Sequence, residues 1–216
     1  QKTGYIIWGD KMGKKDMISF IDFQSQPLKI SQIASRIIIM WILSIPCGLL
    51  GAYHGFTSVF FAIVNVLLTI LGVYLILSAK RNVYQNFFIG SHMLYISVVL
   101  VFASFKFLFI NGDTKIWVLI FLLLILLINI ILFKFIVKLN IKNGAYTNKE
   151  PANKGLFIIS FGGAVLGVVL SRYLSRNVSQ SIVELVLAGL LYLVALLLSI
   201  GSLSLYKAFL QYKFKL

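Results

Sequence analysis

Long apolar runs, separated by short polar segments, set the pattern of this chain. A membrane-spanning helix needs about 20 apolar residues to cross a hydrocarbon layer of about 30 Å. Six runs approach or reach that length, and the clearest reads WVLIFLLLILLINIILF. The pattern predicts an all-α integral membrane protein, a six-transmembrane-helix bundle with spans near 37–53, 58–79, 87–110, 116–137, 155–171 and 182–206.

The placement of lysine and arginine predicts how these spans are oriented. On one side of the membrane lie 6 cations in residues 1–36, 2 at Lys80 and Arg81, 5 between 134 and 154 and 3 after 206, which makes 16. The other side holds the remaining 4 of the 20. Because cytoplasmic loops are enriched in lysine and arginine, we expect both termini in the cytoplasm.

Three parts of the chain lie outside the predicted spans. Residues 1–36 form an N-terminal segment, and 16–24 within it either lie on the inner membrane surface or pack as an ordered tail under the bundle. Residues 29–36 are expected to be either the start of the first helix or a short interfacial helix. The loop 138–154 is rich in asparagine and contains Gly144 and Pro151, which favours irregular structure. Residues 207–216 are expected to form a basic cytoplasmic tail.

Composition and charge fit this picture. Sixty per cent of the 216 residues are apolar and 12% are charged, a balance that suits lipid better than a soluble fold. The net charge of +14 is distributed between the apolar runs, so it indicates contacts with anionic lipid headgroups and not a nucleic-acid surface. We therefore expect a multi-pass protein of the cell membrane, and the richness in Phe, Ile, Lys and Asn favours a bacterial source.

Small residues predict where helices approach closely. Between helices already in lipid, close packing relies on small side chains. The fifth predicted span carries two such rows, one at every fourth residue and one beside it: Gly163, Gly167 and Ser171, with Ser160 and Ala164. We expect these rows to pack against the sixth span, through Ala188, Gly189, Ala195 and Ser199, or to form a homodimer seam.

A few polar side chains lie deep in the predicted spans. They either form helix-to-helix hydrogen bonds or line a small pathway, and both interpretations stay open: Asn65, Thr69, Ser97, Ser104 and Asn129. Lys106 and Lys134 lie near span ends, where long cationic side chains can reach the headgroups by snorkelling.

Acidic residues are few, and none lies at the centre of a span. This argues against a proton-coupled or sodium-coupled carrier, since such carriers usually hold a carboxylate within the membrane. Glu184 and Ser181 have the spacing of a capping box, which is the interpretation we favour. An outer ion pair of Glu184 with Arg172 or Arg176 is compatible with it.

No catalytic or metal-binding motif is evident. Cys47 is the single cysteine, so an internal disulfide is excluded, and no Cys/His cluster suggests a metal site. His54 and His92 are predicted at opposite membrane surfaces, which prevents them from sharing an ion. We expect no cofactor and no enzymatic activity.

Two functional classes follow, with a membrane-embedded enzyme as a third and weaker one. The first is a small transport component, a membrane subunit of a larger transport or secretion assembly that lacks its own energy-coupling domain. The alternative is a non-catalytic accessory, assembly or immunity-type protein that binds a membrane partner. In both classes the chain contacts a protein partner or a second copy of itself.

Overall fold

The computed structural model describes residues 5–7, 10–12, 14–22, 28–49, 54–78, 81–109, 115–143, 146 and 180–214. Its long helices are α2 (Ile30–Leu49), α3 (His54–Leu77), α4 (Arg81–Leu108), α5 (Ile116–Lys142) and α7 (Gln180–Ser199). A 3-10 turn, η1 (Ile200–Ser202), connects α7 to α8 (Leu203–Phe214). The N-terminal part has α1 (Lys14–Asp22) and an antiparallel hairpin of β1 (Tyr5–Ile7) and β2 (Asp10–Met12), which pairs Ile6 with Lys11.

Five of the described segments are long and apolar enough to cross a membrane: Ile30–Leu49, His54–Leu77, Tyr84–Leu108, Ile116–Lys142 and Ile182–Lys213. The chain is therefore a multi-span helical membrane protein. The predicted span at 155–171 lies outside the described residues. The last segment passes through η1 and continues as α8. The predicted tail at 207–216 is therefore helical as far as Phe214.

The first spanning helix begins at Ile30, seven residues before the predicted apolar run at 37–53. Of the two arrangements predicted for 29–36, the structure therefore shows the start of the first helix. The side chain of Gln32 accepts a hydrogen bond from the Lys29 backbone N–H (3.0 Å), and this satisfies a free donor just before the helix. Arg36, assigned by the sequence to the N-terminal segment, therefore lies within a spanning helix.

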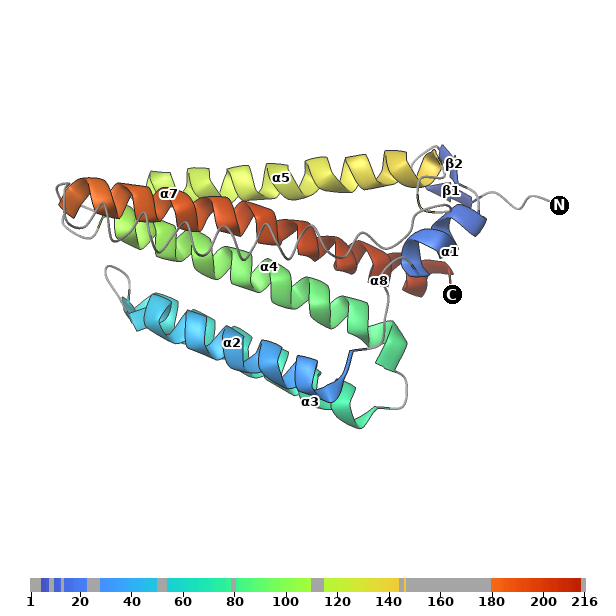
Figure 1. Ribbon diagram of the computed structural model, residues 1–216, viewed down its shortest axis with the longest axis horizontal. Helices are drawn as coiled ribbons and strands as arrows, with labels where there is room; N and C mark the ends of the chain where they lie inside the picture. Colours follow the sequence, from blue (N-terminus) through green and yellow to red (C-terminus); the bar gives the residue numbers. More distant parts are fainter. Residues whose placement is uncertain are drawn as a thin grey trace.

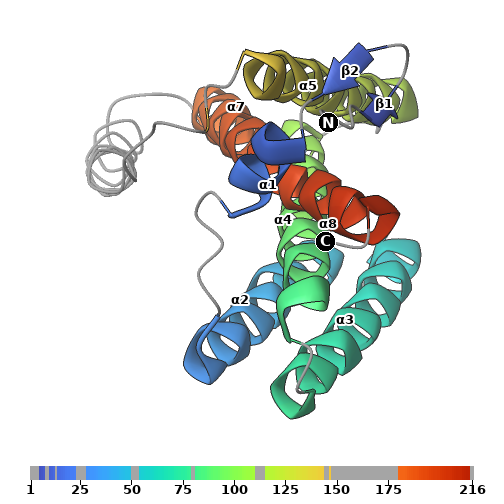
Figure 2. The ribbon, with the colours of Figure 1, turned by 90° about the vertical axis from the view of Figure 1, so that its right-hand side faces the viewer.

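Helix α4 is the centre of the bundle. Figures 1 and 2 show α2 and α3 as a pair on one side of α4, and α5 with α7 on the other. Among the described glycines, the tightest contact is at Gly90 of α4, where an added Cβ would lie 2.5 Å from the backbone nitrogen of Leu205 in α8. A larger residue at this position would push α4 and α8 apart.

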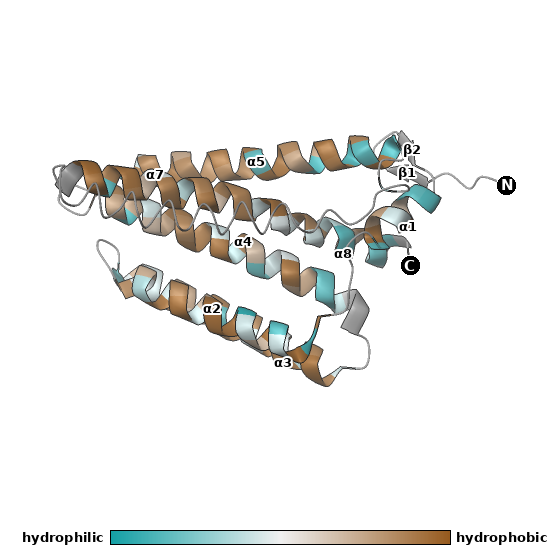
Figure 3. Cartoon of the chain, viewed as in Figure 1, coloured by the Kyte–Doolittle hydropathy of each residue, from teal (hydrophilic) through white to brown (hydrophobic). Residues whose placement is uncertain are grey.

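Apolar side chains face both inward and outward, as expected for helices in lipid. The main buried cluster includes Phe61, Tyr95 and Phe105, while Trp117 of α5 is 76% exposed and Leu77 of α3 is 80% exposed. Figure 3 shows apolar residues along the long helices and polar residues gathered at the end that carries α1 and α8. We call this end, which includes Lys29, Lys207 and Lys213, the basic end.

Helix α1 packs under the bundle at the basic end. Met17, Phe20 and Ile21 are buried in one cluster with Val137 and Ile141 of α5 and Tyr206 and Leu210 of α8. Residues 16–22 thus form an ordered segment packed against helix ends, one of the two arrangements predicted for 16–24, while 23 and 24 lie outside the described residues.

Candidate functional site

Two of the deep polar residues connect α3 to α2. Asn65 donates from Nδ2 to Ser44 Oγ (2.7 Å), and Trp41 donates from Nε1 to Thr69 Oγ1 (3.1 Å). Asn65 is 1% exposed. These side chains bond the two helices of the first hairpin to each other.

The other three deep polar residues form hydrogen bonds elsewhere in the bundle. Ser97 donates to Met93 O of its own helix (2.8 Å), and Ser104 of α4 donates to Ala188 O of α7 (2.8 Å). Asn129 of α5 donates to Leu196 O of α7 (3.1 Å). The five residues therefore do not converge on one place, and four of them form helix-to-helix hydrogen bonds.

A small cavity of about 180 Å³ lies between α2 and α3. Asn65 and Ser58 line it, and Asn65 Oδ1 and Ser58 Oγ are buried without a hydrogen-bond partner. The volume suits a few water molecules, which satisfy such oxygens in protein interiors.

Lys106 forms the most strongly bonded polar cluster among the described residues. It is 6% exposed, and its Nζ donates to Cys47 O (2.6 Å), to Gly48 O (3.2 Å) and to Thr57 Oγ1 (2.9 Å). Thr57 Oγ1 in turn donates to Gly48 O (2.9 Å). The expectation that Lys106 reaches the headgroups is wrong, because its ammonium is turned inward.

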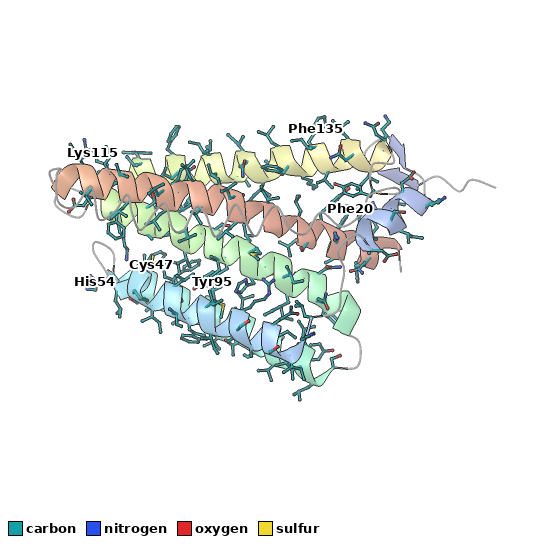
Figure 4. The ribbon with its side chains drawn as sticks, viewed as in Figure 1. Phe20, Cys47, His54, Tyr95, Lys115 and Phe135 are labelled. Carbon is teal, nitrogen blue, oxygen red and sulfur yellow. The ribbon has the colours of Figure 1, made fainter. Side chains whose placement is uncertain are left out.

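The Lys106 ammonium turns inward because it meets the C-terminal end of α2. The last carbonyls of a helix lack N–H partners and carry its partial negative charge. An ammonium from α4 satisfies them without a carboxylate. Figure 4 shows Cys47 and Tyr95 between the α2–α3 pair and α4, and Cys47 Sγ donates to Val99 O (3.3 Å). This cluster ties the first hairpin to α4, and its donors are all used, so it is not a free binding site.

A larger cavity, of about 710 Å³, opens at the basic end. Its lining combines apolar side chains with amides and three cations; the polar residues are Lys29, Gln32, Arg36, Gln85, Asn86, Asn140, Tyr146, Ser204 and Lys207. They lie at or just before the start of α2, at the start of α4, at or just beyond the end of α5, and in the first half of α8. Concave sites with an apolar wall and a few polar groups are typical of ligand binding.

Hydrogen bonds between separate elements hold the walls of this cavity. Gln85 Oε1 accepts from the Leu28 backbone N–H (2.9 Å), which fixes the chain as it enters α2. Asn86 Nδ2 donates to Gln211 Oε1 of α8 (3.0 Å). The walls are thus fixed by contacts that do not use the Arg36 side chain.

Arg36 is the principal unpaired cation of this cavity. It lies about 9 Å along α2 from the first residue of the helix. Within the part of the chain that the structure describes, its guanidinium has no carboxylate or other hydrogen-bond acceptor. An ionisable residue inside a membrane span is costly, and it usually marks a functional site.

His92 lies beside Arg36. Its Nε2 is 3.0 Å from Arg36 O, and because a carbonyl only accepts, Nε2 carries the proton. The Nδ1 atom is buried without a partner, and the residue is 4% exposed. His92 lies eleven residues into α4.

Several predicted site residues are not part of this cavity. The packing residues Ser160, Gly163, Ala164, Gly167 and Ser171 lie outside the described residues, as do Arg172 and Arg176. Glu184 is half-buried on α7. Ala188, Ala195 and Ser199 of the same helix are buried, whereas an added Cβ on Gly189 would meet no atom of the described residues within 4 Å.

Neither a family model, nor a curated protein, nor a solved structure matches this chain. Its own residues therefore carry the functional argument. The relevant class is a helical membrane protein with a sizeable basic cavity among its described residues.

Proposed function

We propose that this chain is a membrane component of a transport or secretion assembly that takes up an anionic amphiphile from the lipid leaflet at its basic end. The observation that carries the proposal is the cavity of about 710 Å³ with the unpaired Arg36 guanidinium in its wall. The deep polar side chains are engaged in helix-to-helix bonds, which favours ligand binding from one side over conduction by this chain alone.

We further propose that the protein resides in the plasma membrane of a bacterium with its basic end in the cytoplasm. The excess of lysine and arginine on that side supports this orientation. Anionic lipids there would supply both the headgroups for the surrounding cations and the ligand for the cavity.

Lipid binding by the purified protein tests the proposal. We expect native mass spectrometry from nanodiscs of phosphatidylglycerol and phosphatidylcholine to show selective retention of the anionic lipid. Arg36→Gln should reduce that selectivity at least about tenfold, since a charge-assisted hydrogen bond contributes about 1.5–3 kcal/mol. Lys134→Gln is the matched control, because Lys134 is exposed on α5 at the same end and does not line the cavity.

A second measurement separates a binding component from a channel. Vesicles that contain the protein alone should hold a potassium gradient as well as empty vesicles do. A leak that depends on the protein, and that Asn65→Leu or Asn129→Leu reduces, would instead support the pathway interpretation of these residues. Equal retention of both lipids by the protein and by Arg36→Gln would refute the proposed function.

The alternative, an accessory protein that binds a membrane partner, is favoured by α5. This helix is buried among the described residues only at Leu119, Leu126, Val137 and Ile141. Its exposed apolar residues, which include Phe121, Leu124 and Leu127, are left for lipid, another protein or a second copy of the chain by the residues that the structure describes. If the alternative holds, Leu124→Trp on the exposed side of α5 should disrupt a complex while Arg36→Gln leaves it intact.

A further inference from the structure

A second cavity, of about 400 Å³, lies between α2 and α4 and shares Gln32 and Arg36 with the larger one. Its α2 wall is one helix face whose members recur at three-residue and four-residue spacing: Gln32, Ser35, Arg36, Ile39 and Leu43. The opposite wall comes from α4 and α7: His92, Met93, Ile96 and Leu198. The groove is therefore polar toward the basic end and apolar toward the middle of the bundle.

The polar part offers one cationic donor and one neutral acceptor. Arg36 presents a guanidinium, which binds phosphate oxygens in a forked geometry. His92 lines the groove, and its Nδ1 is buried without a hydrogen-bond partner. Because Nε2 donates its proton to the Arg36 carbonyl, Nδ1 is the acceptor of the ring. A phosphate group that also carries a hydroxyl complements both, since its oxygens accept from Arg36 and its hydroxyl donates to His92.

The apolar part favours a lipid over a soluble phosphate compound. Ile39 and Leu43 are 48% and 37% exposed, so this wall is open to the side, where lipid chains lie. From Gln32 to Leu43 the wall extends about 16 Å along α2. A hydrocarbon chain placed here would cover the exposed apolar surface of both residues.

We propose that this groove binds one phosphate-bearing lipid, with its headgroup at Arg36 and His92 and a hydrocarbon chain along Ile39 and Leu43. The inference rests on the proposed function and deepens it, because it names the ligand class and the part of the site that recognises it. Phosphate monoester lipids fit best, since the same group carries the charge and the hydroxyl.

The test measures binding of a short-chain phosphatidic acid to the full chain in detergent, with short-chain phosphatidylcholine for comparison. Ile39→Trp should fill the groove and weaken phosphatidic acid binding at least tenfold. Ile45→Trp is the matched control, since Ile45 is also 48% exposed on α2 and does not line the groove. His92→Phe should weaken phosphatidic acid binding about fivefold to tenfold, because it removes one hydrogen bond to the ligand.

Melting temperature and monodispersity are measured for every variant, and His92→Gln replaces His92→Phe if that protein does not fold. If Ile39→Trp and both His92 variants bind like the wild type while Arg36→Gln binds weakly, the ligand occupies the larger cavity, and only this inference is overturned. If glycerol phosphate competes as well as the lipid, the site recognises a soluble anion and the lipid assignment is wrong. If phosphatidic acid binds no better than phosphatidylcholine, both the inference and the proposed function are refuted.

Discussion

Replacement of Lys106 by methionine tests the inward-turned lysine. Methionine keeps much of the length of the side chain and removes the ammonium. Cys47 O then loses its 2.6 Å donor, whereas Gly48 O keeps the hydrogen bond from Thr57 Oγ1 (2.9 Å). The main consequence is one buried carbonyl without its donor.

The expected loss of stability follows from this one unsatisfied carbonyl, Cys47 O. Leaving a buried acceptor unsatisfied costs about 1–3 kcal/mol. Removal of the ammonium also ends the desolvation penalty of a buried charge, which opposes this loss. We expect the free energy of unfolding to fall by about 1–3 kcal/mol. Breaking a buried pair of full charges costs more, about 3–5 kcal/mol.

Reversible unfolding by dodecyl sulfate in mixed micelles, or steric trapping in bicelles, measures this free energy. Lys115→Met is the matched control, because Lys115 is exposed at the start of α5 and should change stability by less than about 0.5 kcal/mol. Thr57→Val combined with Lys106→Met should show non-additive losses, since the two side chains hydrogen-bond to each other (2.9 Å). If Lys106→Met is as stable as Lys115→Met, the lysine does not hold the first hairpin against α4.

Three further predictions concern packing within the bundle. Gly90→Leu should lower the yield of monodisperse protein in size-exclusion chromatography, because a side chain there meets the Leu205 backbone at 2.5 Å; an unchanged elution profile would contradict the close approach of α4 and α8. Gly189→Ala, at a position with no described atom within 4 Å, should be neutral or stabilise thermally by up to about 1 kcal/mol. Asn65→Leu should cost about 0.6 kcal/mol, and at most about 1.7 kcal/mol, by loss of its bond to Ser44, as measured by the same unfolding assay; a gain in stability would show that this bond is not net favourable.

The membrane class and most of the span positions could be predicted from the sequence, because bilayer-length apolar runs have few alternatives to lipid. The start of α2 could be predicted only as one of two arrangements for 29–36, because the first turns of this helix are polar and lower the local hydropathy. The Lys29–Gln32 hydrogen bond forms only once the helix does. A capping-box search that admits lysine at the first position would have found this start.

The role of Lys106 was hidden for a different reason. A lone lysine near a span end has the same sequence pattern whether it reaches outward or inward. Its partners are two backbone carbonyls and a threonine hydroxyl, and sequence does not mark carbonyls that lack donors. Pro46, near the end of the first apolar run, was the available signal, because a helix end leaves carbonyls that need a donor.

The candidate cavity was the least predictable feature. Arg36 and His92 are 56 residues apart in the chain, and neither pattern nor spacing predicts their contact. Arg36 became relevant because α2 begins at Ile30, before the predicted apolar run at 37–53, whereas His92 already lay within the predicted span 87–110. Helix boundaries, the weakest part of a hydropathy reading, thus decided whether the site could be found.

The most direct measurement is site-directed labelling of single cysteines in a Cys47→Ala background, in sealed vesicles of known orientation. Lys29→Cys reports on the rim of the large cavity, and Lys115→Cys reports on the opposite end of the bundle. A membrane-impermeant maleimide should modify the first only from the cytoplasmic side and the second only from the other side. Modification of both from one side would contradict a spanning bundle whose basic cavity opens to the cytoplasm.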